Sequence, residues 1–159
     1  MSQITEPNKS VLSAEDIAEL PERRNVHQFN AKAIRHTKSI GDLAGLTTIG
    51  IHLVRVEPGD ETTQHHNHEV SDEFVYILQG EGTLFLGDES MIIKAGDFAG
   101  FPKNGEAHSM KNTGDEDLVY LMGGGRPEFD ICNYPKINRR MYLVNGNKEF
   151  VDLEHLGKI

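Results

Sequence analysis

Cysteine is nearly absent from the sequence, since Cys132 is the only one among 159 residues. A single cysteine cannot form an intrachain disulfide, and nothing in its usage indicates an oxidising compartment. Cys132 lies in the segment FDICNY, whose alternating apolar side chains are typical of a strand. We therefore interpret its side chain as a small buried apolar group and not as a nucleophile.

Long apolar runs and a leader segment are also absent. No window of the sequence approaches the roughly 20 apolar residues that a membrane-spanning helix needs. The N-terminal segment carries several acids and has no apolar h-region, which excludes the usual pattern of a signal or transit peptide. We therefore expect a soluble, cytoplasmic protein without a membrane partner.

Positive charge is scarce. The chain has 16 Lys and Arg residues against 25 Asp and Glu residues, and its formal net charge is -9. Such a surface repels phosphate backbones and anionic lipid unless a local basic cluster overrides the mean. The only adjacent basic pairs are Arg23-Arg24 and Arg139-Arg140, and no interleaved aromatic residues accompany them. With no helix-turn-helix pattern attached, we expect no nucleic-acid partner.

The polar N-terminal part, residues 1–45, is expected to form an arm that carries one short helix. Ser13 followed by Asp16 resembles a capping box, which marks the start of a helix. A short apolar stripe begins at Ile17 and ends before Pro21. Outside this helix of one to two turns, we expect the arm to be loose.

From Leu46 onward the chain consists of short β-type runs broken by Gly, Asp, Asn and Pro, which favours a sandwich or barrel. The expected strands are residues 46–57, 73–80, 82–87, 90–96, 107–112 and 117–124, followed by strands in EFDICNY and RRMYLVNGNKEFVDL. Asn145-Gly146 marks a hairpin turn in the last segment. With 37% hydrophobic residues, the chain suffices for one compact all-β domain, with a barrel core at 46–126 and C-terminal strands at 127–159 that pack on it.

Histidines and acids gather in the segment HHNHEVSDEFVYILQG, residues 65–80. Because side chains alternate along a strand, His66 and His68 point to one side and can bind one metal ion together. Glu73 opens the next strand in register with its inward apolar residues, and His108 begins a later strand after a turn rich in Pro and Gly. Imidazoles with one carboxylate suit divalent Mn, Fe, Co, Ni or Zn.

The same residues resemble the two motifs of the cupin superfamily. The first motif, Gly, spacer, His-x-His, Glu and Gly, is matched by Gly59, His66, His68, Glu73 and Gly80. The second motif is matched by Gly96, Pro102, Gly105, His108 and Asn112. One spacer in each motif is a residue longer than usual, between Gly59 and His66 and between Pro102 and Gly105. Two motifs that agree in order and spacing are a specific signal, and the resemblance covers residues 46–124.

The resemblance implies a double-stranded β-helix, or jelly-roll barrel, with a short N-terminal helical arm. It also implies that His66, His68, Glu73 and His108 hold one divalent metal ion. Within the superfamily, the segments around these residues are similar to a bacterial single-domain group that is often labelled sugar-phosphate isomerase-like on similarity alone.

Several neighbouring residues have more ordinary interpretations. His65 and Asp72 face away from the proposed ligands, so we expect His65 on the surface or behind a ligand. Gln64 and Asn112 are candidates to orient a ligating histidine. We expect Tyr76 to pack, whereas Tyr120 and Tyr134 could donate a phenol to a substrate. Solvated surface charges or substrate-binding cations are the interpretations of Arg55, Arg126 and Lys103, and His27 and His52 are expected to be structural.

Two classes of function follow. The first is a mononuclear metalloenzyme acting on a small polar, sugar-like or carboxylate substrate, in which the ion would stabilise an enediolate or enolate or activate dioxygen. Isomerase, lyase and dioxygenase all stay open, and no general base is singled out. The second is a metal- or sugar-binding module without turnover. Apolar positions on both faces of the predicted strands need an outer cover, which a second subunit or the N-terminal arm could supply, so a homodimer is a further hypothesis.

Overall fold

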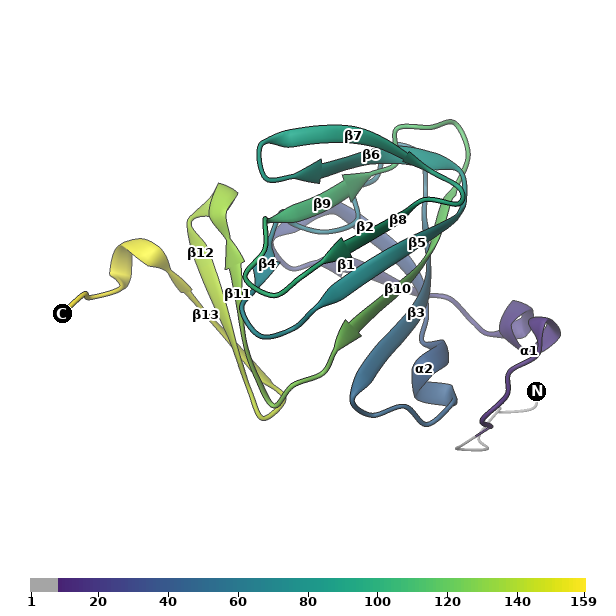
Figure 1. The fold of residues 1–159 in the computed structure, drawn as a ribbon, viewed down its shortest axis with the longest axis horizontal. Helices are drawn as coiled ribbons and strands as arrows, with labels where there is room; N and C mark the ends of the chain where they lie inside the picture. The colour runs from purple at the N-terminus through teal and green to yellow at the C-terminus, as the bar shows by residue number, and fades with distance from the viewer. Residues whose placement is uncertain (1–8) are drawn as a thin grey trace.

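The protein folds almost entirely as β-strands. The structure, a computed structural model, describes residues 9–159 (Figure 1). The strands are β1 (Arg23–His27), β2 (Asn30–Lys38), β3 (Ile49–Val56), β4 (Asn67–His68), β5 (Glu73–Gln79), β6 (Glu81–Leu86), β7 (Glu89–Lys94), β8 (Phe98–Phe101), β9 (His108–Lys111), β10 (Leu118–Gly125), β11 (Phe129–Tyr134), β12 (Arg139–Val144) and β13 (Asn147–Asp152). The helices are α1 (Ala14–Glu19) and α2 (Ile40–Leu43), with 3-10 turns at Pro135–Ile137 and Leu153–His155. The predicted double-stranded β-helix is confirmed.

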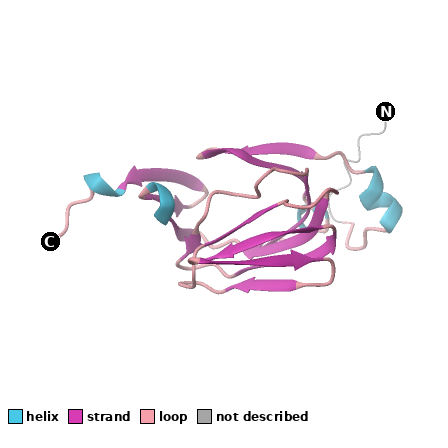
Figure 2. Cartoon of the chain, turned by 90° about the horizontal axis from the view of Figure 1, so that it is seen from above, coloured by secondary structure: helices cyan, strands magenta, loops and turns pink. Residues whose placement is uncertain are grey.

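Two sheets face each other to make the barrel. A six-stranded sheet has the order β1-β2-β3-β10-β5-β8, and a three-stranded sheet has the order β7-β6-β9. The core lies between them and consists of Val54, Val56, Val75, Ile77, Leu84, Ile93, Phe101, Met110, Leu118 and Tyr120. A further sheet, β13-β12-β11-β4, extends sideways from the barrel toward the C-terminus (Figure 2). Tyr120, which was considered as a possible hydrogen-bond donor to a substrate, is a core residue that is only 1% exposed.

Alternation along β5 decides which side chains reach the barrel interior. Val75 and Ile77 are buried, whereas Tyr76 and Leu78 between and beyond them are 41% and 48% exposed. Tyr76 therefore does not pack within the single chain as expected, because the outer face of the six-stranded sheet has no cover at this strand within residues 9–159. Glu73 shares the inward register of Val75 and Ile77, as its spacing predicts.

The expectation of a loose arm is wrong for residues 23–38. β1 and β2 form an antiparallel hairpin, and β2 joins the main sheet by pairing Thr37 with Val54 of β3. These strands are rich in polar residues, so they lack the apolar alternation that marks the others. The α1 helix is confirmed: the Asp16 backbone N–H donates to Ser13 Oγ at 3.1 Å, and the Asp16 carboxylate accepts from the Ser13 N–H at 2.8 Å. Residues 1–8 of the expected arm lie outside the described part.

The remaining strands lie close to their predicted places. The hairpin turn at Asn145-Gly146 joins β12 to β13, and both residues have positive φ, 49° and 83°. The short strand expected around His66 and His68 corresponds to β4, whereas β8 was not predicted, because four residues are too short to show a period. Gly80 ends β5 with a φ of 77°, and a Cβ there would lie 2.5 Å from the Asp117 carbonyl oxygen. The motif glycine at this position therefore permits a tight turn. No helix among residues 9–159 has the length and apolar content to cross a membrane.

Arg55 on β3 is held by surface carboxylates and does not face a ligand site. It donates to Glu22 through Nε at 3.1 Å and through Nη2 at 2.7 Å, and its Nη1 lies 3.2 Å from Asp117 Oδ2. The hydrogen bond from Arg55 lowers the pKa of Glu22 below its ordinary value of 4.5. The Arg55 guanidinium therefore stabilises the charged form of Glu22 in the folded chain.

This ion pair gives a testable dependence of stability on pH. A carboxyl whose pKa is lower in the folded state stabilises the fold above its unfolded pKa, and this stabilisation is lost as pH falls through the folded pKa. We expect Glu22→Gln to remove no more than about 1 kcal/mol at pH 7, since the pair is partly exposed. The loss should shrink toward zero below pH 4.5. Urea unfolding at several pH values measures it. The exposed Glu89→Gln is the control, and an equal pH-dependent loss in that variant would contradict the assignment.

Candidate metal centre

Three histidines and one glutamate meet inside one end of the barrel. His66 precedes β4 and His68 ends it, Glu73 opens β5, and His108 opens β9. Backbone hydrogen bonds tie the first and last together: the His66 N–H donates to the His108 carbonyl at 3.1 Å, and the His108 N–H donates back at 2.8 Å. Segments more than forty positions apart in the sequence are thereby fixed side by side.

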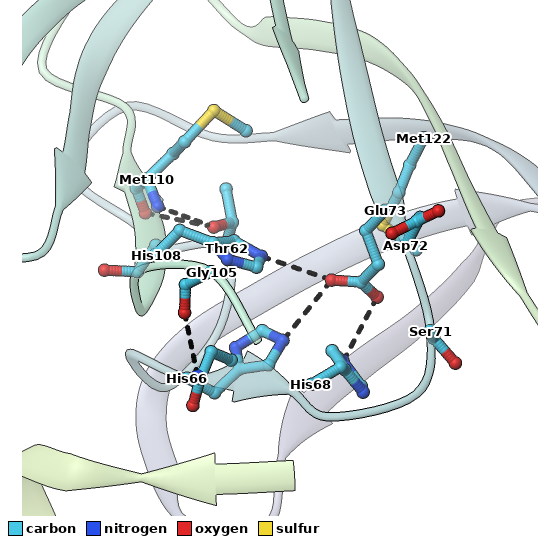
Figure 3. A network of polar contacts seen from close by, with 12 residues as sticks. Thr62, His66, His68, Ser71, Asp72, Glu73, Gly105, His108, Met110 and Met122 are labelled. Atoms are coloured by element: carbon cyan, nitrogen blue, oxygen red, sulfur yellow. Dashed lines mark hydrogen bonds and ion pairs between the residues drawn. The ribbon is translucent and has the colours of Figure 1, made fainter. Parts of the chain in front are cut away.

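The three imidazoles point at the Glu73 carboxylate (Figure 3). Its Oε2 lies 3.1 Å from His108 Nε2 and 3.5 Å from His66 Nε2, and its Oε1 lies 3.4 Å from His68 Nε2. Ligand atoms of His66, Glu73 and His108 all lie within 4.8 Å of one another. Gly124 on β10 permits this placement, because a Cβ there would lie 3.2 Å from Glu73 Cγ. The four predicted residues are therefore brought together, and their role as metal ligands stays a prediction.

The second ring nitrogens of two histidines determine which atoms face the centre. His66 Nδ1 lies 2.8 Å from the Gln64 carbonyl oxygen, and His68 Nδ1 lies 2.7 Å from Asp130 Oδ2. Both partners only accept, so each Nδ1 carries a hydrogen, and each Nε2 either donates to Glu73 when it also carries one or offers its lone pair to a cation when it does not. Lone pairs facing a carboxylate repel it unless a cation lies among them. This donor set of nitrogens and one carboxylate therefore fits a divalent first-row ion.

His108 is oriented by packing. Its ring stacks on Phe101 with centroids 3.7 Å apart and an angle of 2° between the planes. Its Nδ1 is buried and has no hydrogen-bond partner among residues 9–159. The rule that a ligating imidazole is oriented by a second hydrogen bond therefore holds for His66 and His68 but not for His108, where Phe101 fixes the ring plane instead.

Charge at the centre is balanced between Glu73 and its neighbours. Burial raises the pKa of the Glu73 carboxyl, but hydrogen bonds from the three histidines outweigh burial and lower that pKa well below 4.5. Burial lowers the pKa of His68, whereas contacts with Glu73 and Asp130 raise it above 6.5. Burial lowers the pKa of His108. The carboxylate is therefore ionised at neutral pH, as a metal ligand must be.

Comparison with known proteins adds the family. Residues 52–124 match the protein family described as "Cupin domain". The crystal structure of a candidate sugar phosphate isomerase from Acidithiobacillus ferrooxidans is 40% identical, with a TM-score of 0.92 over 95% of this chain and 97% of that one. The chain is a cupin. A cupin described as a sugar phosphate isomerase, from Silicibacter pomeroyi, is 25% identical with a TM-score of 0.79 over 91% of this cupin and 94% of that chain.

A curated relative has a different name. The oxalate-binding protein of Thermotoga maritima is 41% identical to this cupin over 68 residues, which are 43% of this chain. This cupin spans about half of that relative's length, 54%.

Asp130 is a neighbour of the candidate centre that the sequence did not indicate. It lies on β11, which pairs with β4, and it is 5% exposed. Besides accepting from His68, its Oδ2 accepts from Ser71 Oγ at 2.8 Å, and its Oδ1 accepts from the backbone N–H groups of Val70 and Ile131 at 3.0 and 2.8 Å. The carboxylate is therefore fixed on four sides and holds the ring of His68. The single acid in the strand segment FDICNY was the available signal.

The two residues proposed to orient a ligand act differently from the prediction. Gln64 orients His66 through its backbone carbonyl and not through its side chain. Asn112 is fully buried, where its Nδ2 donates to the carbonyls of Val56 and Glu116 at 2.8 Å each, so it closes a turn and not the hydrogen bonds of the candidate centre. The motif asparagine is therefore a structural residue in this cupin.

The neighbours that were not proposed as ligands lie outside the centre. His65 is buried and not on the surface, with Nδ1 at 3.0 Å from Ser109 Oγ. Asp72 accepts from the Lys103 backbone N–H at 2.8 Å. Arg126 pairs with Asp42 at 2.6 Å. His52 Nδ1 lies 3.1 Å from Ser39 Oγ, in keeping with a structural role.

Cys132 and Tyr134 form part of the wall beside the histidines. Cys132 is 2% exposed on β11, opposite His68 of β4, which agrees with its predicted burial. Its sulfur and ring nitrogens of His66 and His68 lie within 4.8 Å of one another. The Tyr134 ring lies 5.9 Å from that of His66, between centroids. Spacing alone did not reveal that this strand closes the site.

Proposed function

We propose that this cupin is a mononuclear metalloenzyme that acts on a small polar substrate, sugar-like or carboxylate in character. The observation that carries the proposal is the convergence of three imidazole nitrogens on the Glu73 carboxylate inside a cavity of about 530 Å³. A cavity of this size suits a small ligand. The names of the similar proteins, sugar phosphate isomerase and oxalate-binding protein, support a small oxygen-rich ligand.

Some residues of the site would bind the ion, and others would orient the residues that bind it. His66, His68, His108 and Glu73 would bind one ion of Mn, Fe, Zn, Ni or Co through three nitrogens and one oxygen. When bound, such an ion supplies a Lewis acid that polarises substrate oxygens. Asp130 keeps the His68 ring in one tautomer and one orientation, and the buried strand β11 limits access of water from that side. Isomerase, lyase and dioxygenase are the reaction types under this proposal.

A binding module without turnover is the second candidate. One specific observation favours it: within the described residues that line the cavity, the only carboxylate is Glu73, which is already committed to the centre. No separate acid is therefore placed to act as a general base. The name of the T. maritima oxalate-binding protein supports the same candidate.

Metal analysis followed by substrate screening tests the two candidates together. The purified protein is expected to contain one equivalent of a divalent first-row metal. The loaded protein is then screened under air and without oxygen against aldoses, ketoses, their phosphates and small carboxylic acids. Turnover of one class supports the enzyme, whereas binding without turnover supports the module. Absence of stoichiometric metal after loading would contradict the metalloenzyme and a metal-binding module.

We also propose a homodimer that covers the outer face of β5 and β8. Phe98 is 64% exposed there and pairs with Tyr76, beside an apolar groove of about 980 Å³ that includes Phe74 and Pro102. Patches of this kind often mark contacts between proteins. Light scattering after size exclusion is expected to give about twice the 17.7 kDa of one chain. Phe98→Glu should shift the protein to a monomer, while Ile92→Glu, on the other sheet, should not. A wild-type monomer at micromolar concentration would refute the dimer.

A further inference from the structure

The cavity over the candidate centre carries a second set of side chains that the cupin motifs do not include. Its lining contains Arg23 of β1, Arg35 of β2 and Lys148 of β13, together with the four centre residues. All three cations come from segments outside residues 52–124, which the cupin domain match covers. The N-terminal hairpin and the C-terminal hairpin therefore add to the cavity what the barrel core lacks.

Strand pairing places the basic side chains of the hairpin on one face. Arg23 pairs with Thr37, and Asn25 pairs with Arg35, across the antiparallel strands β1 and β2. Directly opposed residues in such a pair point to the same side of the sheet. The face that carries Arg23, Asn25 and Arg35 is the one that lines the cavity. This explains why the two strands are polar although they belong to the main sheet.

Arg35 is the most informative of the three cations. Its guanidinium is partly buried, and its Nη1 lies 3.7 Å from Met122 Sδ. No Asp or Glu of residues 9–159 forms an ion pair with Arg35, Arg23 or Lys148, although Arg55 and Arg139 elsewhere have close carboxylate partners. A partly desolvated guanidinium without an anion is costly, and its planar fork matches carboxylate or phosphate oxygens.

The charge of the cavity is opposite to that of the chain. Three permanent cations face one carboxylate, Glu73, and that carboxylate already contacts three imidazoles, whereas the whole chain has a net charge of -9. The pKa of His27, on the same hairpin, reflects this positive charge. Burial, and then repulsion by Arg35, His66 and Lys148, lower the pKa of His27 to about 4. A positively charged cavity in an acidic protein attracts anions.

We propose that Arg35, with Arg23 and Lys148, binds a phosphate group of the substrate, so that these residues determine specificity for a phosphorylated small molecule. A phosphate monoester carries nearly two negative charges and three accepting oxygens. It therefore matches three cations better than a ligand with a single carboxylate would. The cavity volume of about 530 Å³ leaves space for a sugar-sized body between this subsite and the metal centre. The role in substrate choice rests on the proposed function, whereas the anion subsite itself does not.

Calorimetric titration of the full chain tests the subsite with defined probes: ribose 5-phosphate, ribose, inorganic phosphate and oxalate. Wild type is expected to bind ribose 5-phosphate at least about 10-fold more tightly than ribose. Arg35→Met should lose about 10-fold in affinity for ribose 5-phosphate, the size of one lost charge-assisted hydrogen bond, and should leave ribose unchanged. Lys94→Met, which removes an exposed cation on β7, is the matched control and should bind like wild type.

Three results would overturn the proposal: wild type that does not distinguish ribose 5-phosphate from ribose, Arg35→Met with unchanged affinity, or oxalate bound more tightly than both phosphates. If Arg35→Met does not fold, as judged by circular dichroism, Lys148→Met, at an exposed position of β13 at the cavity, carries the same expectation. Metal content is a separate readout. A chain that holds metal but ignores phosphate refutes only the subsite, and one that binds phosphate through Arg35 but holds no metal refutes only the metal function.

Discussion

Replacing His66 by alanine is expected to abolish stoichiometric metal binding. His66 Nε2 faces Glu73 at 3.5 Å, and its Nδ1 is fixed by the Gln64 carbonyl at 2.8 Å, so the ring is already oriented for a ligand role. We expect the affinity for the metal to fall by more than about 100-fold, because residues that merely orient a ligating histidine are worth about 10- to 100-fold. Elemental analysis of the purified variant measures the loss.

A second readout of the same variant is thermal stability with and without metal. A ligand at 100 times its dissociation constant stabilises a folded protein by about 2.7 kcal/mol. Wild type should gain this stability on metal addition, and His66→Ala should not. His155→Ala is the matched control, because His155 is exposed in the last 3-10 turn. A His66→Ala protein that keeps one equivalent of metal would remove His66 from the ligand set.

The second large effect is expected from Asp130→Asn, a change of one atom. The backbone N–H groups of Val70 and Ile131 both donate to Asp130 Oδ1, so the side-chain oxygen of the asparagine must occupy this position. The amide NH₂ would then face His68 Nδ1, which is itself a donor in the native arrangement. The His68 ring would take the other tautomer, with hydrogen on Nε2, and lose the lone pair that faces the centre.

We expect Asp130→Asn to weaken metal affinity by about 10- to 100-fold with little change in the fold. Competition with a chelator of known affinity measures this loss. Asp152→Asn is the matched control: Asp152 belongs to the same C-terminal sheet but pairs with Arg139 at 2.7 Å. Equal metal affinity in Asp130→Asn and wild type would show that the carboxylate does not position His68. A loss in the Asp152 variant of the same size would point to the sheet as a whole.

The placement of His66, His68 and Glu73 could be predicted from local rules, whereas the barrel and the addition of His108 were implied by the resemblance to the two cupin motifs. Alternation places Glu73 on the face of Val75 and Ile77, and the spacing of His66 and His68 places both on one side of a short strand. The N-terminal hairpin escaped prediction because alternation detects strands that separate an apolar core from water. Arg35 and its neighbours face a polar cavity instead, so their strand has no apolar period.

The orienting residues could not be predicted because they are long-range partners. Asp130 lies 62 positions from His68, and no local pattern links an acid on β11 to an imidazole on β4. Asn112 was assigned to the metal centre from its place in a motif, yet its hydrogen bonds close a turn at 0% exposure. Motif position identifies which residues recur in a family, whereas the hydrogen-bond partners of each side chain depend on how distant strands meet.

The pairing of β4 with β11 would couple metal binding at His68 to the docking of the C-terminal sheet. β4 ends at His68, and β11 begins the C-terminal sheet that supplies Asp130. An ion that binds only the oriented ring also favours every conformation in which β11 is docked. It follows that metal concentration sets the local unfolding equilibrium of a hairpin that contributes no ligand. Backbone amides of β11 and β12 should therefore exchange with solvent at rates that depend on metal occupancy.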